Sequence, residues 1–276
     1  MIKDLRERTG VGMIKCKKAL EESNGDVEKA IVALRKAGIA SAVKKESREA
    51  KEGAIDFVET ATSIGICQMN AETDFVVNNE RFRAFLNDMA KEVANSESAD
   101  LEAFVSKAYS GDSGKTVDEK RKELIAVLGE NILISKIIYL KKAADTSYGI
   151  YSHMNGKIFT LVELQGSSDE GDFAKEIAMH VAAEAPEYLS KEEVPVDVRE
   201  AEEEIAKSRV PAGKPVEIVD KILAGKMAAF YNSICLVNQK YIKDNTCTVL
   251  DLVNAKGKET GKSLKIKGFY RLQVGL

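Results

Sequence analysis

The segments ICQMNAETDF, residues 66–75, and FLNDMAKEVA, residues 85–94, have counterparts in the second half of the chain. The counterparts are TLVELQGSSD, residues 160–169, and FAKEIAMHVA, residues 173–182. In both copies an apolar segment of strand-like composition leads through a polar loop into a helix with recurring apolar positions. An internal repeat of this kind indicates two related subdomains, each made of a sheet and helices.

Around these segments each copy has the pattern of a hairpin followed by a helix and a later closing strand. In the first copy we expect strands at Ala54–Ala61 and Ile64–Ala71, helices at Asn79–Ala94 and Thr116–Leu128, and a β-rich run at Ile132–Leu140. In the second copy we expect strands at Tyr148–His153 and Lys157–Leu164, a helix at Phe173–Ala183 and a terminal strand at Gly268–Val274. The inward face of the first helix is marked by Phe82, Phe85, Leu86 and Met89.

The amino-terminal segment has the pattern of three short helices, Ile2–Thr9, Gly12–Glu22 and Asp26–Lys36, with Gly38 closing the third. On the second helix Cys16, Ala19 and Leu20 share one face, which we expect to pack against the third helix. Ile14 falls almost opposite that face, beside Lys17 and Lys18. An outward isoleucine is either an isolated exposed apolar residue, which is common, or a docking anchor.

A helical hairpin interrupts the second copy. Its arms are predicted at Val196–Ser208 and Val216–Tyr231, around the breaker Pro211-Ala212-Gly213-Lys214-Pro215. The predicted class is α+β. The domains are a helical domain at 1–39, a linker at 40–52, core subdomain 1 at 53–142, core subdomain 2 at 143–184 and 232–276, and the inserted hairpin at 185–231.

Composition excludes several classes of protein. The formal charge is −3, from 41 basic and 44 acidic residues, so no strong positive field is available to hold nucleic acid. Residues 1–52 carry a net charge of +4, which suits docking to another protein. The four cysteines, Cys16, Cys67, Cys235 and Cys247, are too far apart for a metal site and are expected to be reduced thiols. No apolar run is long enough to span a membrane, so we expect a cytoplasmic protein.

Three motifs occurring in order resemble the elongation factor Ts family: LRERTGVGMIKCKKALEESNGD at residues 5–26, NAETDFV at residues 70–76 and AMHVAA at residues 178–183. The resemblance covers nearly the whole chain. It implies a guanine nucleotide exchange factor that binds elongation factor Tu with bound GDP, releases the GDP and lets GTP rebind. It implies no covalent chemistry, no cofactor and no metal site in this chain.

The same resemblance assigns contact residues. The amino-terminal helices look like a ubiquitin-associated-type domain whose second helix rests on the GTPase, and Arg6, Met13, Ile14 and Lys17 match the family's docking positions. Thr73, Asp74, Phe75 and Val76 match a wedge that inserts beside the magnesium site of the GTPase. His153 matches a histidine that the family places near the far domain of elongation factor Tu.

The internal repeat gives a separate argument for Phe75. Where copy one has Glu72-Thr73-Asp74-Phe75-Val76 between strand and helix, copy two has Gly166-Ser167-Ser168-Asp169-Glu170, without an aromatic residue. The scaffold therefore does not need an aromatic side chain at this place. We interpret Phe75 as a residue with an external role.

Two other hypotheses compete. An interaction adaptor would need only the amino-terminal helical surface, whereas an exchange factor also needs the aromatic residue at the sheet edge. An enzyme using Asp74 and a neighbouring carboxylate is the third, but the chain has no nucleophile and base at matching spacing and no phosphate-binding glycine loop. The sequence leaves open whether the helical hairpin mediates a homodimer or a 2:2 complex.

Overall fold

The computed structural model describes residues 1–211 and 215–275. The middle of the expected hairpin breaker, Ala212 to Lys214, and the last residue, Leu276, lie outside the described residues. The chain divides into two compact units. Unit 1 comprises Met1–Lys142, Met154–Lys157 and Gln273–Leu276, and unit 2 comprises Ala143–His153 and Ile158–Leu272. The chain combines helices with small sheets, which confirms the predicted α+β class.

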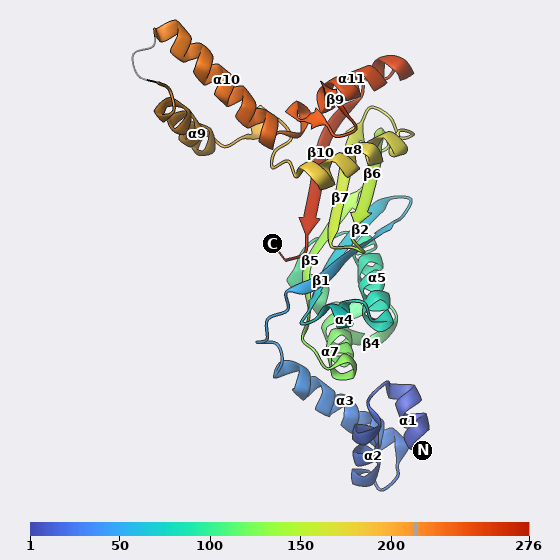
Figure 1. The fold of residues 1–276 in the computed structure, drawn as a ribbon. Helices are drawn as coiled ribbons and strands as arrows, with labels where there is room; N and C mark the ends of the chain where they lie inside the picture. Colours follow the sequence, from blue (N-terminus) through green and yellow to red (C-terminus); the bar gives the residue numbers. More distant parts are fainter. Residues whose placement is uncertain (212–214, 276) are drawn as a thin grey trace. The chain divides into compact units, whose positions relative to one another are not determined.

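Unit 1 begins with three helices, α1 (Ile2–Thr9), α2 (Met13–Glu22) and α3 (Val27–Val43) (Figure 1). Gly10 ends α1 in the left-handed conformation at φ 70°, and the Asp26 side chain caps α3 by accepting from the Lys29 amide. A small core joins the three helices, and its buried members are Leu5, Val11, Cys16, Ala19, Leu20 and Ala30. The predicted inward face of α2 is confirmed.

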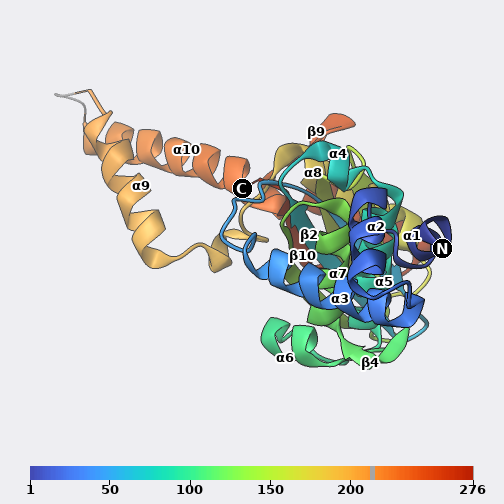
Figure 2. The same cartoon turned by 90° about the horizontal axis from the view of Figure 1, so that it is seen from below.

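The predicted end of the third helix was wrong. Gly38 lies inside α3, which continues to Val43 and so enters the segment interpreted as a linker. A Cβ at Gly38 would stand 2.7 Å from the Cβ of Ala126 on α7 (Val117–Leu128). The glycine therefore permits close packing of α3 on α7, which lie next to each other in Figure 2, instead of terminating the helix. Glycine takes this role because it lacks the Cβ that would collide.

The sheet of unit 1 has the order β1-β2-β5, from β1 (Glu52–Glu59), β2 (Ser63–Ala71) and β5 (Ile132–Lys141), and both pairings are antiparallel. Helix α5 (Glu80–Ala94) packs on this sheet and buries the four predicted residues, Phe82, Phe85, Leu86 and Met89. The remaining elements are α4 (Asp74–Val77), α6 (Leu101–Ser106), β3 (Ala108–Tyr109) and β4 (Asp112–Thr116).

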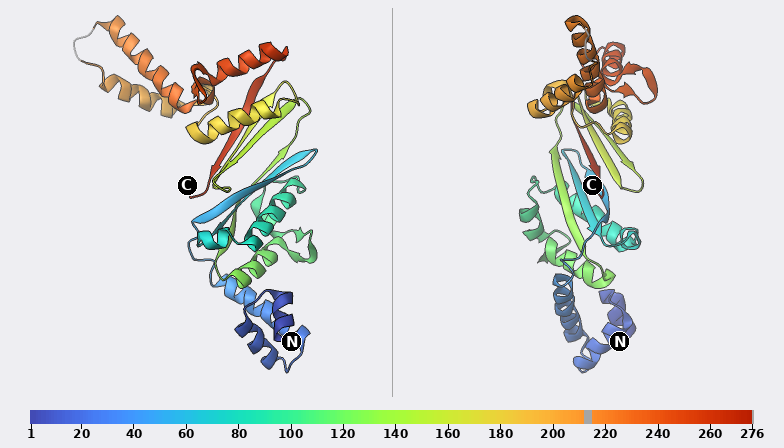
Figure 3. Two further views of the ribbon diagram at one scale, coloured as in Figure 1. Left: turned by 45° about the vertical axis from the view of Figure 1, so that its right-hand side comes forward. Right: turned by 60° about the vertical axis from the view of Figure 1, so that its left-hand side comes forward.

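Unit 2 repeats this topology with the order β10-β7-β6, from β6 (Thr146–His153), β7 (Ile158–Gln165) and β10 (Lys265–Gln273). Helix α8 (Gly171–Glu184) runs along the sheet, as both views of Figure 3 show. A short hairpin of β8 (Lys240–Tyr241) and β9 (Asp244–Thr248) leads into α11 (Val249–Thr260). The insertion consists of α9 (Val196–Ser208) and α10 (Val216–Ile234), flanked by single 3-10 turns at Lys191–Glu193 and Leu236–Asn238.

The repeat extends beyond the sheet and the long helix, α5 or α8, of each unit. In both units a two-residue strand pairs with the five-residue strand that follows it. The five-residue strand then enters a helix through a capping box, Thr116 with Glu119 in unit 1 and Thr248 with Asp251 in unit 2. The tyrosine of each short strand donates a hydrogen bond to a carboxylate of the main helix, Tyr109 to Asp88 and Tyr241 to Glu176. Each main helix also accepts a hydrogen bond from the hairpin backbone, at Glu92 in unit 1 and at His180 in unit 2.

Candidate functional site

The most exposed aromatic side chain of the described residues belongs to Phe75, which is 84% exposed. It lies on α4, a single helical turn between β2 and α5. The next two residues, Val76 and Val77, are buried in the core of unit 1. Because the two valines anchor the turn, Phe75 and its neighbour Asp74 are directed to solvent.

Glu130 holds the start of this turn. Its carboxylate accepts two hydrogen bonds from Thr73, one from the backbone amide at 2.9 Å and one from the hydroxyl at 2.7 Å. The same hydroxyl accepts from the Val76 amide at 3.4 Å and so caps the turn. The Glu72 carboxylate in turn accepts from the Asn131 amide at 2.7 Å. The loop before Phe75 and the loop before β5 are therefore joined by hydrogen bonds in both directions.

The other end of the turn is also fixed within unit 1. Asn78 follows α4, and its side-chain oxygen accepts from Arg83 at 3.4 Å and from the Asn155 amide group at 3.1 Å. With hydrogen bonds at both ends and two valines in the core, the turn holds Phe75 in a defined place. A side chain that is already ordered loses less entropy when it binds a partner.

The predicted docking residues lie on α1 and α2. Ile14 is 86% exposed and Met13 is 57% exposed, which confirms that Ile14 points away from the helical core. Arg6 and Lys17 are also exposed, and the Lys17 ammonium stands 3.8 Å from the Glu21 carboxylate one turn later. Two adjacent apolar side chains beside cationic ones form a surface that suits an apolar pocket with an acidic rim.

His153 ends β6 in unit 2, where its side chain is exposed. The Nδ1 atom is 2.9 Å from the Tyr151 hydroxyl, and the two rings stack with centroids 5.8 Å apart. The structure therefore gives His153 a neighbour that fixes its ring. The other predicted contact residues, from Arg6 to Val76, all belong to unit 1.

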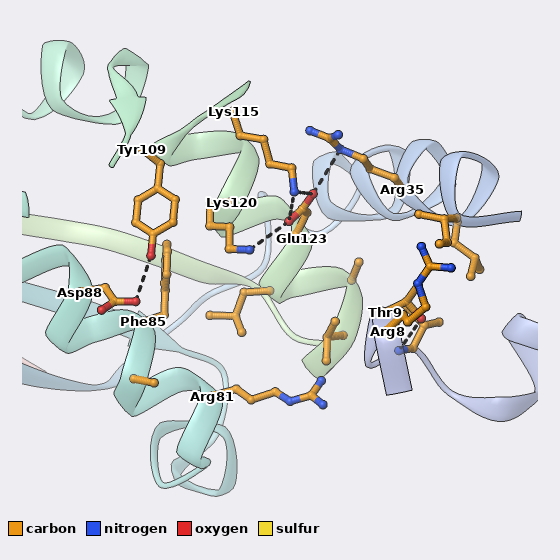
Figure 4. A pocket seen from close by; sticks show the side chains of 17 residues that line it. Arg8, Thr9, Arg35, Arg81, Phe85, Asp88, Tyr109, Lys115, Lys120 and Glu123 are labelled. Atoms are coloured by element: carbon orange, nitrogen blue, oxygen red, sulfur yellow. Dashed lines mark hydrogen bonds and ion pairs between the residues drawn. The ribbon is translucent and has the colours of Figure 1, made fainter. Parts of the chain in front are cut away.

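A cavity of about 500 Å³ in unit 1 was not expected from the sequence. It lies among α1, α3, α5 and α7, and Figure 4 shows the charged side chains on its wall. The Glu123 carboxylate of α7 forms ion pairs with Arg35 at 3.1 Å, Lys115 at 2.8 Å and Lys120 at 3.4 Å. The pair with Arg35 links α7 to α3. On another wall, burial and then the hydrogen bond to Asp88 raise the pKa of Tyr109 to about 12. Tyr109 therefore stays protonated and structural at neutral pH.

The cysteine thiols and the acidic side chains are the groups that could form a metal site. None of the four cysteines forms a disulfide: Cys16, Cys67 and Cys235 are buried, and Cys247 is partly exposed. Desolvation raises the pKa of the Cys235 thiol to about 11. Over residues 1–211 and 215–275 no cluster of three or more histidine, cysteine or acidic side chains is arranged to bind a metal ion. The helices of that same part are all too short or too polar to cross a membrane.

Comparison with known proteins identifies the family. The family model described as elongation factor TS matches residues 72–276. Elongation factor Ts of Protochlamydia amoebophila is 54% identical over 275 residues, which cover 100% of this chain and 97% of that protein. The proteins of the same name from Chlamydia felis and Chlamydia caviae are 44% and 43% identical over 274 residues, which cover 99% of this chain and 97% of each relative.

Proposed function

The chain belongs to the elongation factor Ts family of translation elongation factors, and on that premise we propose that it releases GDP from elongation factor Tu. The observation that carries this proposal is Phe75, a large apolar side chain that is held in solvent by a turn fixed at both ends. A monomer gains nothing from ordering an exposed aromatic side chain. A partner that offers a pocket for it gains a pre-organised anchor.

The proposed mechanism is mechanical displacement. A GTPase holds GDP through backbone amides around the phosphates and through a bridging Mg²⁺ ion, so a small shift of these groups removes much of the affinity. Phe75 and Asp74 enter beside this site, with Thr73 and Val76 as the residues that place them. Asp74 brings a carboxylate near the cation. Among the described residues no side chain forms a hydrogen bond or ion pair with this carboxylate.

Docking comes from a separate surface. In the proposal Ile14 and Met13 of α2 fill an apolar pocket of the GTPase, and Arg6 and Lys17 supply charge at its rim. The net charge of +4 on residues 1–52 supports this arrangement, because it favours approach to an acidic partner surface. His153 is proposed as a further contact with elongation factor Tu.

Exchange is reciprocal. If the bound factor lowers the affinity of the GTPase for GDP by a given ratio, GDP must lower the affinity of the GTPase for the factor by the same ratio. GTP then completes the cycle by displacing the factor. No covalent bond is formed or broken, so we propose an exchange factor and not an enzyme. A cytoplasmic location follows from a role in translation, and we propose no direct contact with nucleic acid or membrane.

The test is release of a fluorescent GDP analogue from elongation factor Tu. The parent chain should accelerate release, and Phe75→Ala should lower the accelerated rate by roughly tenfold or more, as for an aromatic interface anchor. Asp74→Asn should cause a smaller loss. Both variants should still bind the GTPase, because the amino-terminal docking surface is unchanged.

The matched control is Leu250→Ala, which removes an exposed apolar side chain from α11 in unit 2. This variant should accelerate release as the parent does. Equal acceleration by the parent and by Phe75→Ala would show that the aromatic residue has no part in exchange. An adaptor without exchange activity would bind the GTPase and leave the release rate unchanged.

A further inference from the structure

Helix α7 in unit 1 and helix α11 in unit 2 each end at a glycine. The residue that follows this glycine occupies an equivalent place in the two units. In unit 1 α7 ends at Gly129, with φ 88°, and Glu130 follows. In unit 2 α11 ends at Gly261, with φ 70°, and Lys262 follows. Both residues lie in the short connection to the third strand of their sheet.

These two residues hold the same loop in their own unit, the loop from the second strand to the main helix. Glu130 accepts from the Thr73 amide at 2.9 Å and from the Thr73 hydroxyl at 2.7 Å. Lys262 donates to Asp169 at 2.8 Å and to Glu170 at 2.6 Å. The connection is thus conserved between the repeats in position, while the charge of the holding side chain is reversed.

The sign of the charge decides what happens to the acidic residues of the loop. In unit 2 the Lys262 ammonium pairs with Asp169, and this hydrogen bond lowers the pKa of the carboxyl to about 2. In unit 1 the Glu130 carboxylate holds the loop by accepting from a backbone amide and a hydroxyl, and it forms no ion pair with an acidic residue of the loop. The Asp74 carboxylate therefore has no cationic partner from this connection.

We propose that Glu130 is a positioning residue for the Phe75 turn, and this inference rests on the proposed exchange function. The Thr73 hydroxyl has one proton, which it donates to Glu130, so its lone pairs remain for the Val76 amide. Glu130 thereby orients the cap of a four-residue helix that is too short to be stable alone. Removing the carboxylate frees the turn without touching Phe75 or Asp74.

A lysine at position 130 would imitate unit 2. Its ammonium could not accept from the Thr73 amide, and position 130 adjoins Asn131, whose amide donates to Glu72, so the ammonium would be drawn to this acidic residue of the loop instead. We therefore expect Glu130→Lys to impair exchange more than Glu130→Ala does. Glu130→Gln keeps one acceptor oxygen and should retain an intermediate rate.

The experiment combines GDP release with hydrogen exchange of the peptide that spans residues 72–78. Glu130→Ala should lower the accelerated GDP release rate by roughly three- to tenfold. It should also speed hydrogen exchange of the Thr73 and Val76 amides. In a Phe75→Ala background Glu130→Ala should cause at most the smaller loss expected for Asp74, because the aromatic side chain that it positions is gone. A general structural defect would lower the rate by the same factor in both backgrounds.

Lys262→Ala is the matched control, since it opens the equivalent connection in unit 2. It should speed hydrogen exchange at residues 166–170 and leave GDP release at the parent rate. If Glu130→Ala matches the parent while Phe75→Ala does not, the positioning role is wrong and the exchange function stands. If the parent itself does not accelerate release, the exchange function fails and the inference fails with it.

Discussion

At position 75 a phenylalanine remains in water because Val76 and Val77 beside it fill the core of unit 1. Its removal should therefore leave folding intact. We expect Phe75→Ala to change the free energy of unfolding of unit 1 by less than about 0.5 kcal/mol. Val77→Ala should cost about 2 kcal/mol, because a buried valine is lost. Urea unfolding of the two variants checks the contrast, and a large loss in Phe75→Ala would place that ring in the core.

A second residue, His180, makes the stability of unit 2 depend on pH. It is fully buried, and its Nδ1 accepts from the Ile242 amide at 3.2 Å, so Nε2 carries the proton and donates to Gln239 at 3.0 Å. Burial lowers the pKa of His180, although the hydrogen bond to Gln239 and the nearby Glu184 oppose this. Below a pH of about 6.5 the unfolded chain binds a proton that the folded chain does not.

The stability that His180 contributes is therefore present above that pH and is lost on acidification. We expect the urea midpoint of unit 2 to fall between about pH 7.5 and about pH 5.5. His180→Gln keeps an acceptor for the Ile242 amide but has no titrating group, so its midpoint should fall less over the same range. Parallel curves for parent and variant would show that another group causes the dependence.

At the scale of elements, α3 and α7 touch where neither can carry an extra atom. Gly38→Ala gains about 1 kcal/mol of helix propensity, but the new methyl group meets Ala126 at 2.7 Å, and overpacking costs about 1–3 kcal/mol. We expect a net loss of stability in Gly38→Ala. The double variant Gly38→Ala with Ala126→Gly should recover most of it. Thermal unfolding checks this, and failure of the second change to restore the midpoint would refute the steric explanation.

The elements also show what a single sequence can predict. Helices α1, α2 and α5 follow from apolar spacing, and the repeat gave both sheets their hairpins. The one-turn helix α4 was missed because four residues are too few to show a period. Helix α11 was missed although Thr248 and Asp251 form a capping box that signals its start.

Candidate contact residues were easier to find than the residues that support them. Exposure of Ile14 could be predicted from its angle on α2, and Phe75 was distinguished by its absence from copy two. Glu130 acts on Thr73 across 57 residues, and such a contact has no local signal. Only the parallel between Gly129-Glu130 and Gly261-Lys262 could have drawn attention to it.

For the molecule as a whole, the α9 and α10 hairpin is an addition to unit 2. None of the described side chains of α10 is buried, and unit 1 manages with a short segment, including α6, at the corresponding place. We expect a chain that lacks residues 196–231, with a short glycine linker in their place, to fold with its thermal midpoint lowered by only a few degrees. Circular dichroism checks this, and loss of cooperative unfolding would show that the hairpin belongs to the core.

The polypeptide passes between the two units several times, since residues 154–157 and the segment from Gln273 belong to unit 1. The carbonyl of Gly156 accepts from the Ile55 amide at 2.8 Å, and Lys157 accepts from the Val274 amide at 2.9 Å. During synthesis on the ribosome the first unit is therefore incomplete until Val274 has left the exit tunnel. Its last hydrogen bond forms only then, although its first strand was made more than two hundred residues earlier.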